Sequence, residues 1–342
     1  MIALLLAAAS AAEHPSLPPE PKDFGDWEVG CDNHRDCEAV GFQEPFDPDS
    51  ETPFISVVID RKADALAQPK AYIDIRFFEL DDYTGDIVAD GKRTGLGLNK
   101  GGDLVGSSHD FARVLAASKS VSLVDAKGKT LGIFRTSGAS AALRWMDEQQ
   151  QRAGGETAIV AHGNKPWSII PWPPTLPTIV VPPNSSKPPH KLRTSEVAAV
   201  RKRFDMCDNP RGEVEYYRID KANSIAIVNC WNGPYQSDGI IVLVPDNGRY
   251  RLASIDPTTR EEAKGSTRDR ARLISPSYDE KRRLLYMEYR GRGLNDCGGS
   301  ASWAWDGTAF RLSSYRALDE CRGVTASLPH WQTSNDPAAP DE

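Results

Sequence analysis

The chain has 342 residues, of which 39% are apolar and 26% are charged, and its formal net charge is −7. This composition is typical of a soluble globular protein long enough for two domains, and it excludes a disordered chain. An acidic protein repels polyanions, so the charge also argues against nucleic acid as a partner.

The first residues, MIALLLAAASAAEHP, form a short apolar run that ends in small side chains. Ala9-Ser10-Ala11 matches the small-x-small pattern of a signal-peptide cleavage site. The run is about half as long as a membrane span requires, and a lipid anchor would need a cysteine well before Cys31. We therefore predict a signal peptide over residues 1–12, no transmembrane anchor, and a periplasmic or secreted protein.

The segment 21–163 begins with strand-like runs and continues with helix-like ones. Apolar and polar residues alternate in WEVGC, CEAVGF, FISVVID and AYIDIRF, which is typical of strands. Helical spacing predicts one helix from His109 and another after Ser137, with the strand pair SVSLVD and KTLGIFR between them. Ser137 is the expected cap of the second helix, and Gly154 its end. These elements predict an α+β domain with a mostly antiparallel sheet and two helices.

Residues 164–190, NKPWSIIPWPPTLPTIVVPPNSSKPPH, contain nine of the 25 prolines. Proline removes amide donors and fixes φ, so the segment is predicted to be an extended, polyproline-like connector. Its apolar residues, which include Trp167, Ile169 and Trp172, are too many for a free linker. We expect a Pro-rich strap whose apolar side chains pack against a domain surface.

Residues 191–331 are predicted to open on one helix, TSEVAAVRKRF, and to continue as β structure. Seven short alternating runs follow, and DNG at Asp246 and WDG at Trp305 are hairpin-turn signals. The pattern predicts a mostly antiparallel β domain, either a sandwich or a curled sheet. Residues 332–342 are polar and rich in proline, so they are predicted to form a disordered tail.

The charge is divided unevenly along the chain. The formal net charge is −10 over residues 1–163 and +3 over the remainder, which together give −7. Opposite charges on the two halves would help them to dock, or would steer different partners to each half.

Six cysteines are present, at positions Cys31, Cys37, Cys207, Cys230, Cys297 and Cys321. An even number in an exported chain indicates disulfides, and six cysteines allow 15 pairings. Pairing neighbours along the sequence gives the simplest set, Cys31–Cys37, Cys207–Cys230 and Cys297–Cys321.

The stretch CDNHRDC leaves a metal site as the alternative to a disulfide. Cys31, His34 and Cys37, with Asp32 or Asp36, could ligate zinc, whereas a redox motif would be C-x-x-C. Export favours the disulfide, with His34 pointing to solvent.

No motif points to catalytic, cofactor-binding or metal-ligating residues, and we predict none. GSSHD (106–110) lacks the context of a nucleophilic serine, so Ser107 or Ser108 is expected to cap a helix. TGLGLNKGGD (94–103) lacks the Lys-Ser/Thr ending of a phosphate-binding loop. The arginine-rich stretch 268–292 is expected to form an exposed strand face, with an anion-binding patch as the alternative.

Five stretches carry a family resemblance: FGDWEVGCDNHRDCEAVGF, the helix SGASAALRWMDEQQQRAGGETAIVAHG with its exit, the Pro-rich strap, NCWNGPYQSDG, and CGGSASWAWDGTAFRL followed by DECRG. In that order they resemble the bacterial exported family called domain of unknown function 1176, over nearly the whole chain. The first half is also similar to invasion-associated locus B-like periplasmic proteins. Both resemblances imply export, disulfides and a two-part build, and neither implies a reaction.

We therefore expect an exported, disulfide-stabilised envelope protein that binds and does not catalyse, and that needs no cofactor. Its partner would be another envelope protein or a cell-wall or surface component. The alternative is a periplasmic, hydrolase-like enzyme with a site assembled from scattered acidic, Arg and His residues. A deep pocket with convergent polar groups and shifted pKa values would favour the enzyme, and a flat or grooved aromatic surface would favour the binding protein.

Overall fold

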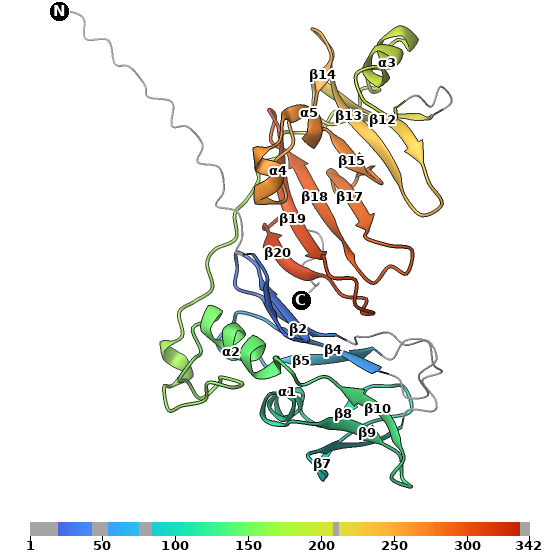
Figure 1. Cartoon of the computed structure of the whole chain (residues 1–342). Coiled ribbons are helices and arrows are strands. Elements are labelled where there is room, and N and C mark those ends of the chain that lie inside the picture. The colour runs from blue at the N-terminus through green and yellow to red at the C-terminus, as the bar shows by residue number, and fades with distance from the viewer. Residues whose placement is uncertain (1–19, 43–53, 75–83, 208–211, 336–342) are drawn as a thin grey trace, which may run out of the picture.

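The computed structural model describes residues 20–42, 54–74, 84–207 and 212–335. The signal peptide predicted over 1–12 lies outside these ranges, as do residues 336–342 of the predicted tail. Within the described ranges, no helix has both the length and the apolar character that crossing a bilayer requires. The regular structure is mostly β sheet with a few short helices, so the predicted α+β class is confirmed in outline (Figure 1).

The N-terminal part is built on one ten-stranded sheet. Its strands are β1 (Lys22–Phe24), β2 (Trp27–Cys31), β3 (Cys37–Gly41), β4 (Phe54–Arg61), β5 (Lys70–Asp74), β6 (Gly85–Ala89), β7 (Lys92–Leu98), β8 (Leu104–Val105), β9 (Val121–Val124) and β10 (Thr130–Phe134). They join in the order β1-β2-β3-β4-β10-β9-β6-β7-β8, and β5 pairs with β4. Among these strands the pairs are antiparallel, apart from β4 with β10. The predicted pair SVSLVD and KTLGIFR is β9 with β10.

Two helices cover one face of this sheet, α1 (Ser108–Ala117) and α2 (Ala139–Gln149) (Figure 1). Their buried side chains share one apolar core with Trp27 and the inward residues of β2 to β4. The predicted ends of α2 are wrong. Gly138, whose φ is +92°, is the N-cap residue in place of Ser137. Glycine is required at this position because a Cβ would lie 1.5 Å from the carbonyl oxygen of Phe24. The helix also ends before Gly154.

The C-terminal part contains two five-stranded sheets. The first is made of β11 (Val214–Arg218), β12 (Asn223–Asn232), β13 (Ser237–Pro245), β14 (Arg251–Leu252) and β15 (Arg272–Ile274). The second is made of β16 (Ser277–Asp279), β17 (Leu284–Arg290), β18 (Gly298–Trp305), β19 (Phe310–Leu318) and β20 (Leu328–Gln332). The predicted DNG and WDG turns connect antiparallel neighbours, β13 with β14 and β18 with β19.

These two sheets enclose a common core. Ile225 and Ile241 from the first sheet lie in one cluster with Leu285, Trp303 and Tyr315 from the second. The outer face of the first sheet is covered by α3 (Thr194–Arg201), which buries Val197 and Val200 against it. Two short helices, α4 (Arg260–Lys264) and α5 (Thr267–Arg270), lie between β14 and β15.

The two parts of the chain meet where β20 lies against β2 and β3, on the sheet face opposite the helices (Figure 1). The contact has an apolar centre, in which Val40 and Phe42 pack against Leu318, Val324 and Leu328. Close approach is essential, since a Cβ on Gly30 would come within 3.0 Å of the Leu328 Cβ.

Ion pairs surround this apolar centre. Arg316 donates to Glu38 at 2.7 Å, and Arg322 donates to Asp26 at 3.3 Å while stacking on the Phe42 ring. In both pairs the acid comes from the N-terminal part and the arginine from the C-terminal part. Both pairs have the polarity that docking of an acidic first half onto a basic second half would require.

The CDNHRDC turn connects three segments of the chain. Asn33 and Gln332 exchange two hydrogen bonds of 2.9 and 2.8 Å between β20 and this turn. Gln150, just after α2, donates to the Arg35 carbonyl oxygen. The prediction that His34 points to solvent is wrong, because its Nδ1 lies 2.7 Å from the carbonyl oxygen of Pro174 in the strap.

The strap is held by backbone hydrogen bonds and half-buries some of its apolar side chains, but its most prominent ones are exposed. A short 3₁₀ turn spans Trp167–Ile169, and further along Ser334 donates to the Pro177 carbonyl oxygen. Trp172 is 86% exposed and Ile169 is 59% exposed, so the expected burial of these side chains is wrong. The contact with Ser334 also corrects the predicted start of the tail, because the chain remains ordered beyond Gln332.

Asn335 fastens the strap and provides a test of its anchoring. Its Oδ1 accepts from the Ile179 amide at 2.6 Å and its Nδ2 donates to the Ile179 carbonyl oxygen at 3.0 Å. Asn335→Ala should therefore increase thermolysin cleavage in front of Ile179 about fivefold, since these bonds contribute about 1 kcal/mol net. Asn184→Ala, at an exposed strap position that lacks such a contact, is the control. Equal cleavage rates in both variants would contradict the anchoring role.

Candidate functional site

The six cysteines form three disulfides, Cys31–Cys37, Cys207–Cys230 and Cys297–Cys321. This is the sequential pairing expected from the sequence. The alternative zinc site in CDNHRDC would need the thiolates of Cys31 and Cys37, and both sulfurs are bonded to each other instead. Asp296 lies within 4.8 Å of the sulfurs of Cys297 and Cys321, but these sulfurs are likewise joined in a disulfide.

The serines of GSSHD accept hydrogen bonds from backbone amides. Ser107 Oγ accepts from the Asp110 amide at 3.2 Å and caps α1, while Ser108 Oγ accepts from the Ala71 amide at 3.1 Å. Burial, together with Arg61 and Arg113, holds the pKa of His109 below its usual value. The capping interpretation is confirmed, and it falls on Ser107.

Removing this cap has a defined cost. Ser107→Ala should lower the free energy of unfolding by about 1 kcal/mol, within a range of about 0.5–2 kcal/mol. Ser140→Ala, at an exposed position inside α2, should be neutral or slightly stabilising because alanine favours helix. Urea unfolding of both variants measures the difference. A Ser107 variant as stable as the parent would contradict the assigned cap.

Four arginines of the arginine-rich stretch 268–292 make internal contacts. Arg272 donates to Asp238 and Arg292 to Asp296, at 3.0 and 2.7 Å. Arg270 and Arg283 donate to backbone carbonyl oxygens, of Ile255 and Ile219 respectively. These four guanidinium groups hold loops in place, and the anion-binding alternative stays a prediction for the remaining basic residues of the stretch.

A fully buried ionic group lies under α2. The carboxylate of Asp147 accepts from Arg61 at 3.0 Å and from the amides of Ile159, Val160 and Ala161. Burial and the neighbouring Arg152 lower the pKa of Arg61 to about 9, so this side chain is still cationic at neutral pH. Because the group is sealed from solvent, it organises the loop after α2 and does not form a binding site.

Burial raises the pKa values of four carboxyl groups in this region, Glu28, Asp32, Glu38 and Asp60, and the shift is largest for Glu28 and Asp32. Burial, with the charges of Asp23, Asp319 and Glu320, raises the pKa of Glu28 to about 7, and Arg322 opposes this shift. Glu28 is only 6% exposed, and its Oε2 has no hydrogen-bond partner among the described residues.

Asp32 is the second of these carboxyl groups. Burial, and then Asp36, raise its pKa to about 7, although its Oδ1 accepts from the amides of His34 and Asp36. Only Glu28 of these two is shifted by charges of the C-terminal part, so its pKa depends on how the two parts fit together.

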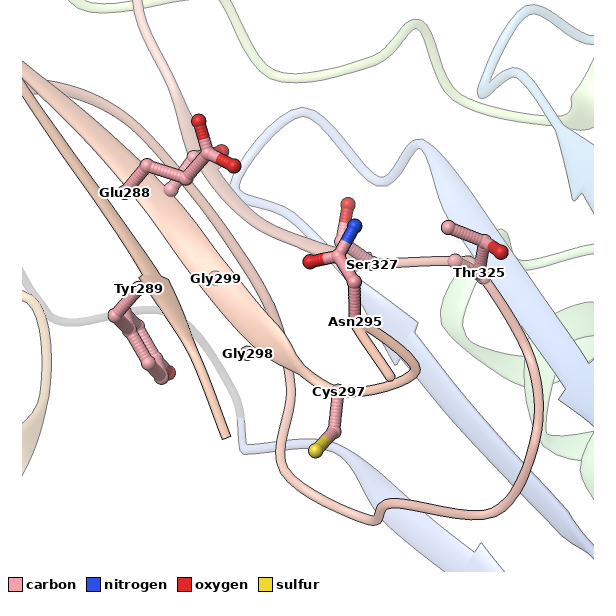
Figure 2. Close-up of a pocket in the computed structure, with 10 residues that line it drawn as sticks. Glu288, Tyr289, Asn295, Cys297, Gly298, Gly299, Thr325 and Ser327 are labelled. Atoms are coloured by element: carbon pink, nitrogen blue, oxygen red, sulfur yellow. The ribbon is translucent and has the colours of Figure 1, made fainter. Parts of the chain in front are cut away.

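A polar hollow of about 300 Å³ opens on the outer face of the second C-terminal sheet (Figure 2). In Figure 2, Glu288, Asn295, Thr325 and Ser327 lie on one side of the β18 ribbon, whereas Tyr289 and Cys297 point to the other side. The complete lining is Glu288, Tyr289, Asn295, Cys297, Gly298, Gly299, Ser300, Thr325, Ala326 and Ser327. Most of its polar groups are neutral hydroxyls and amides, and the one charged lining residue is Glu288.

The floor of the hollow is open because β18 begins with two glycines. A Cβ on Gly298, where φ is +131°, would lie 2.1 Å from the Tyr289 carbonyl oxygen. A Cβ on Gly299 would lie 2.7 Å from the Arg316 carbonyl oxygen. Glycine is therefore required by the neighbouring strands, and a shallow floor without side chains is the result.

The walls of the hollow are fixed by covalent and polar contacts. The Cys297–Cys321 disulfide joins the start of β18 to the segment that precedes Thr325. Asp296, which is buried, accepts from Arg292 and from the Gly323 amide. Arg316 donates to Ser327 and to Glu38, which links the hollow to the N-terminal part. The site is thus preformed and stands beside the contact between the two parts.

Sequence reasoning did not identify this hollow. Its lining comes from β17, β18 and two loops, so no local motif contains it. The one local signal is DCGGS (296–300), in which two glycines follow a disulfide-bonded cysteine.

Comparison with known proteins gives a family but no activity. The family described as "Protein of unknown function (DUF1176)" matches residues 21–336. The chain is 26% identical over 323 residues to "Uncharacterized protein YpfG" of Escherichia coli (strain K12), covering 89% of each chain. No solved structure matches. The similarity of the first half to invasion-associated locus B-like proteins stays a prediction.

Proposed function

Because the chain belongs to the family described as "Protein of unknown function (DUF1176)", whose description assigns no activity, we propose a function from its own residues. The protein is an exported, disulfide-stabilised binding protein of the bacterial envelope, and it holds its ligand in the polar hollow on β17 and β18. Residues 21–163 and 191–331 act as two domains, and 164–190 straps them together.

The single observation that carries this proposal is a preformed hollow. Its floor is set by the glycines of β18, and its walls are fixed by a disulfide and by hydrogen bonds. Disulfide-bonded Cys297 and the glycines of β18 leave no filling side chain, and the exposed side chains of Glu288, Asn295, Ser300 and Thr325 remain available. Small-molecule sites have this combination of concavity and a few placed polar groups. The volume of about 300 Å³ lies at the lower end of their range, roughly 300–1,000 Å³.

The positions of the two carboxyl groups with the most strongly raised pKa values favour binding over catalysis. Glu28 and Asp32, whose pKa values are raised to about 7, are buried in the N-terminal part and do not line the hollow. A general acid or base must reach the reacting group within about 2.6–3.2 Å. The enzyme alternative therefore lacks a specific supporting contact.

A photocrosslinking amino acid at position 325 tests the proposal in living bacteria. Thr325 lines the rim, so we expect a covalent adduct with an envelope component, and Ser300→Trp should abolish it by filling the hollow. The control crosslinker replaces Lys127, in the turn between β9 and β10, and the control bulky variant is Thr308→Trp in an exposed turn. Absence of an adduct at 325, or an adduct unaffected by Ser300→Trp, would refute binding in the hollow.

A further inference from the structure

The chemistry of the hollow specifies a class of ligand. We propose that the hollow binds one sugar unit of an uncharged oligosaccharide, with Tyr235 as the stacking surface for a neighbouring unit. This inference rests on the proposed binding function and names its ligand.

The polar groups of the lining suit a polyhydroxylated ligand. Ser300, Thr325 and Ser327 present hydroxyls that can both donate and accept, Asn295 presents an amide with the same ability, and Glu288 presents an acceptor. A sugar ring carries several hydroxyls that likewise donate and accept in different directions. Four of these residues, Glu288, Asn295, Ser300 and Thr325, are exposed, so their groups are open to a ligand.

The charges around the hollow are balanced, which favours a neutral ligand over a polyanion or a polycation. Arg316 is paired with Glu38, and Arg292 is paired with Asp296. Glu288 lies in register with Ser300, and Arg290 lies in register with Gly298 on the same face of β17. An anionic ligand would be repelled by Glu288 and a cationic one by Arg290, two residues along the same strand.

An exposed aromatic ring lies against the turn that leads into the hollow. Tyr235 is 64% exposed, in the β12–β13 hairpin. A Cβ placed on Gly293 would lie 3.5 Å from Cε2 of Tyr235, so the Tyr235 ring borders the turn that carries Asn295. Gln236 accepts from the Arg290 amide at 3.1 Å and ties the hairpin to β17. The electron-rich face of such a ring attracts the C–H groups of a sugar.

The arrangement also indicates a chain rather than a free monosaccharide. The hollow is small and is bordered by exposed residues, and Tyr235 lies outside its lining. One unit in the hollow and another on the ring would place two anchors along one oligosaccharide. Two linked weak contacts give much higher affinity than either contact alone.

Isothermal titration calorimetry on the full chain tests this inference. The probes are uncharged hexasaccharides of glucose and of N-acetylglucosamine, with a hexasaccharide of galacturonic acid as the charged comparison. We expect saturable binding of at least one uncharged probe and none of the acidic one. Glu288→Ala, Asn295→Ala and Tyr235→Ala should each weaken it about tenfold or more, whereas Tyr72→Ala, at an exposed tyrosine of the N-terminal sheet, should not change it.

Three results would overturn the inference: no binding of either uncharged probe at millimolar concentration, preference for the acidic probe, or binding that the three hollow variants leave unchanged. The variants are at exposed positions, and circular dichroism establishes that each is folded. A failure of sugar binding can be told apart from a failure of the proposed binding function. A crosslink at position 325 that Ser300→Trp abolishes, together with no sugar binding, would keep the hollow as a site and replace the ligand class with another, such as a peptide.

Discussion

Replacing Asp147 by asparagine should lower the free energy of unfolding by about 3–5 kcal/mol. The substitution preserves the volume of the side chain but removes the charge that compensates the buried Arg61. It also weakens the acceptor for the amides of Ile159, Val160 and Ala161. A buried cation without a partner is costly because the interior cannot replace its hydration.

The adjacent residue provides the control for this experiment. Glu148 also pairs with an arginine, Arg144, but on the exposed side of α2. Surface pairs of this kind contribute about 0.3–0.5 kcal/mol, so Glu148→Gln should change the stability by no more than that. Chemical denaturation of the two variants at pH 7 measures both effects. Similar losses in the two variants would show that the buried group does not organise the loop after α2.

Replacing Glu28 by glutamine should stabilise the protein at pH 8 and leave it almost unchanged at pH 4. In the folded protein the pKa of Glu28 is raised from 4.5 to about 7, mainly by burial. The folded state therefore holds the proton more tightly than the unfolded state does. The associated stability is complete below about pH 4.5 and is lost as the pH rises through about 7.

The size of this effect follows from the same two values. A difference from 4.5 to about 7, at about 1.4 kcal/mol for each pH unit, sets an upper limit of roughly 3 kcal/mol at pH 8. Glutamine keeps the neutral form at every pH, so the variant should lose less stability between pH 4 and pH 8 than the parent. Glu280→Gln, at an exposed position, is the matched control. Parallel stability curves for Glu28→Gln and the parent would contradict this role of Glu28.

Local pattern was sufficient to predict much of the fold. The helix near His109 and the hairpin at Asp246 follow from side-chain spacing and turn chemistry, which act over a few residues. The cap of α2 was missed because Gly138 is required by a close contact with Phe24, a residue far away in the sequence. Trp172 was expected to be buried from its apolar character, yet the strap is fastened through its backbone and leaves this ring in solvent.

The hollow and the buried ionic group needed the three-dimensional arrangement. Asp147 occupies the position four residues after Leu143 on the apolar stripe of α2, and a charged residue there was a signal that could have been used. The hollow gave no comparable signal. Glu288, Ser300 and Thr325 are brought together only when β17 and β18 pair and the last loop folds over them.

The contact between Asn33 and Gln332 also constrains how the molecule folds. These residues are separated by 299 positions along the chain, and the strap hydrogen-bonds to Ser334 and Asn335 at the same end. Contacts between such distant positions form late, because their loop-closure entropy must be overcome first. Until the last strand emerges from synthesis, Val40 and Phe42 on the N-terminal sheet have no covering partner. Any folding intermediate in which β20 has not yet docked therefore exposes this apolar surface, and such intermediates are prone to aggregate.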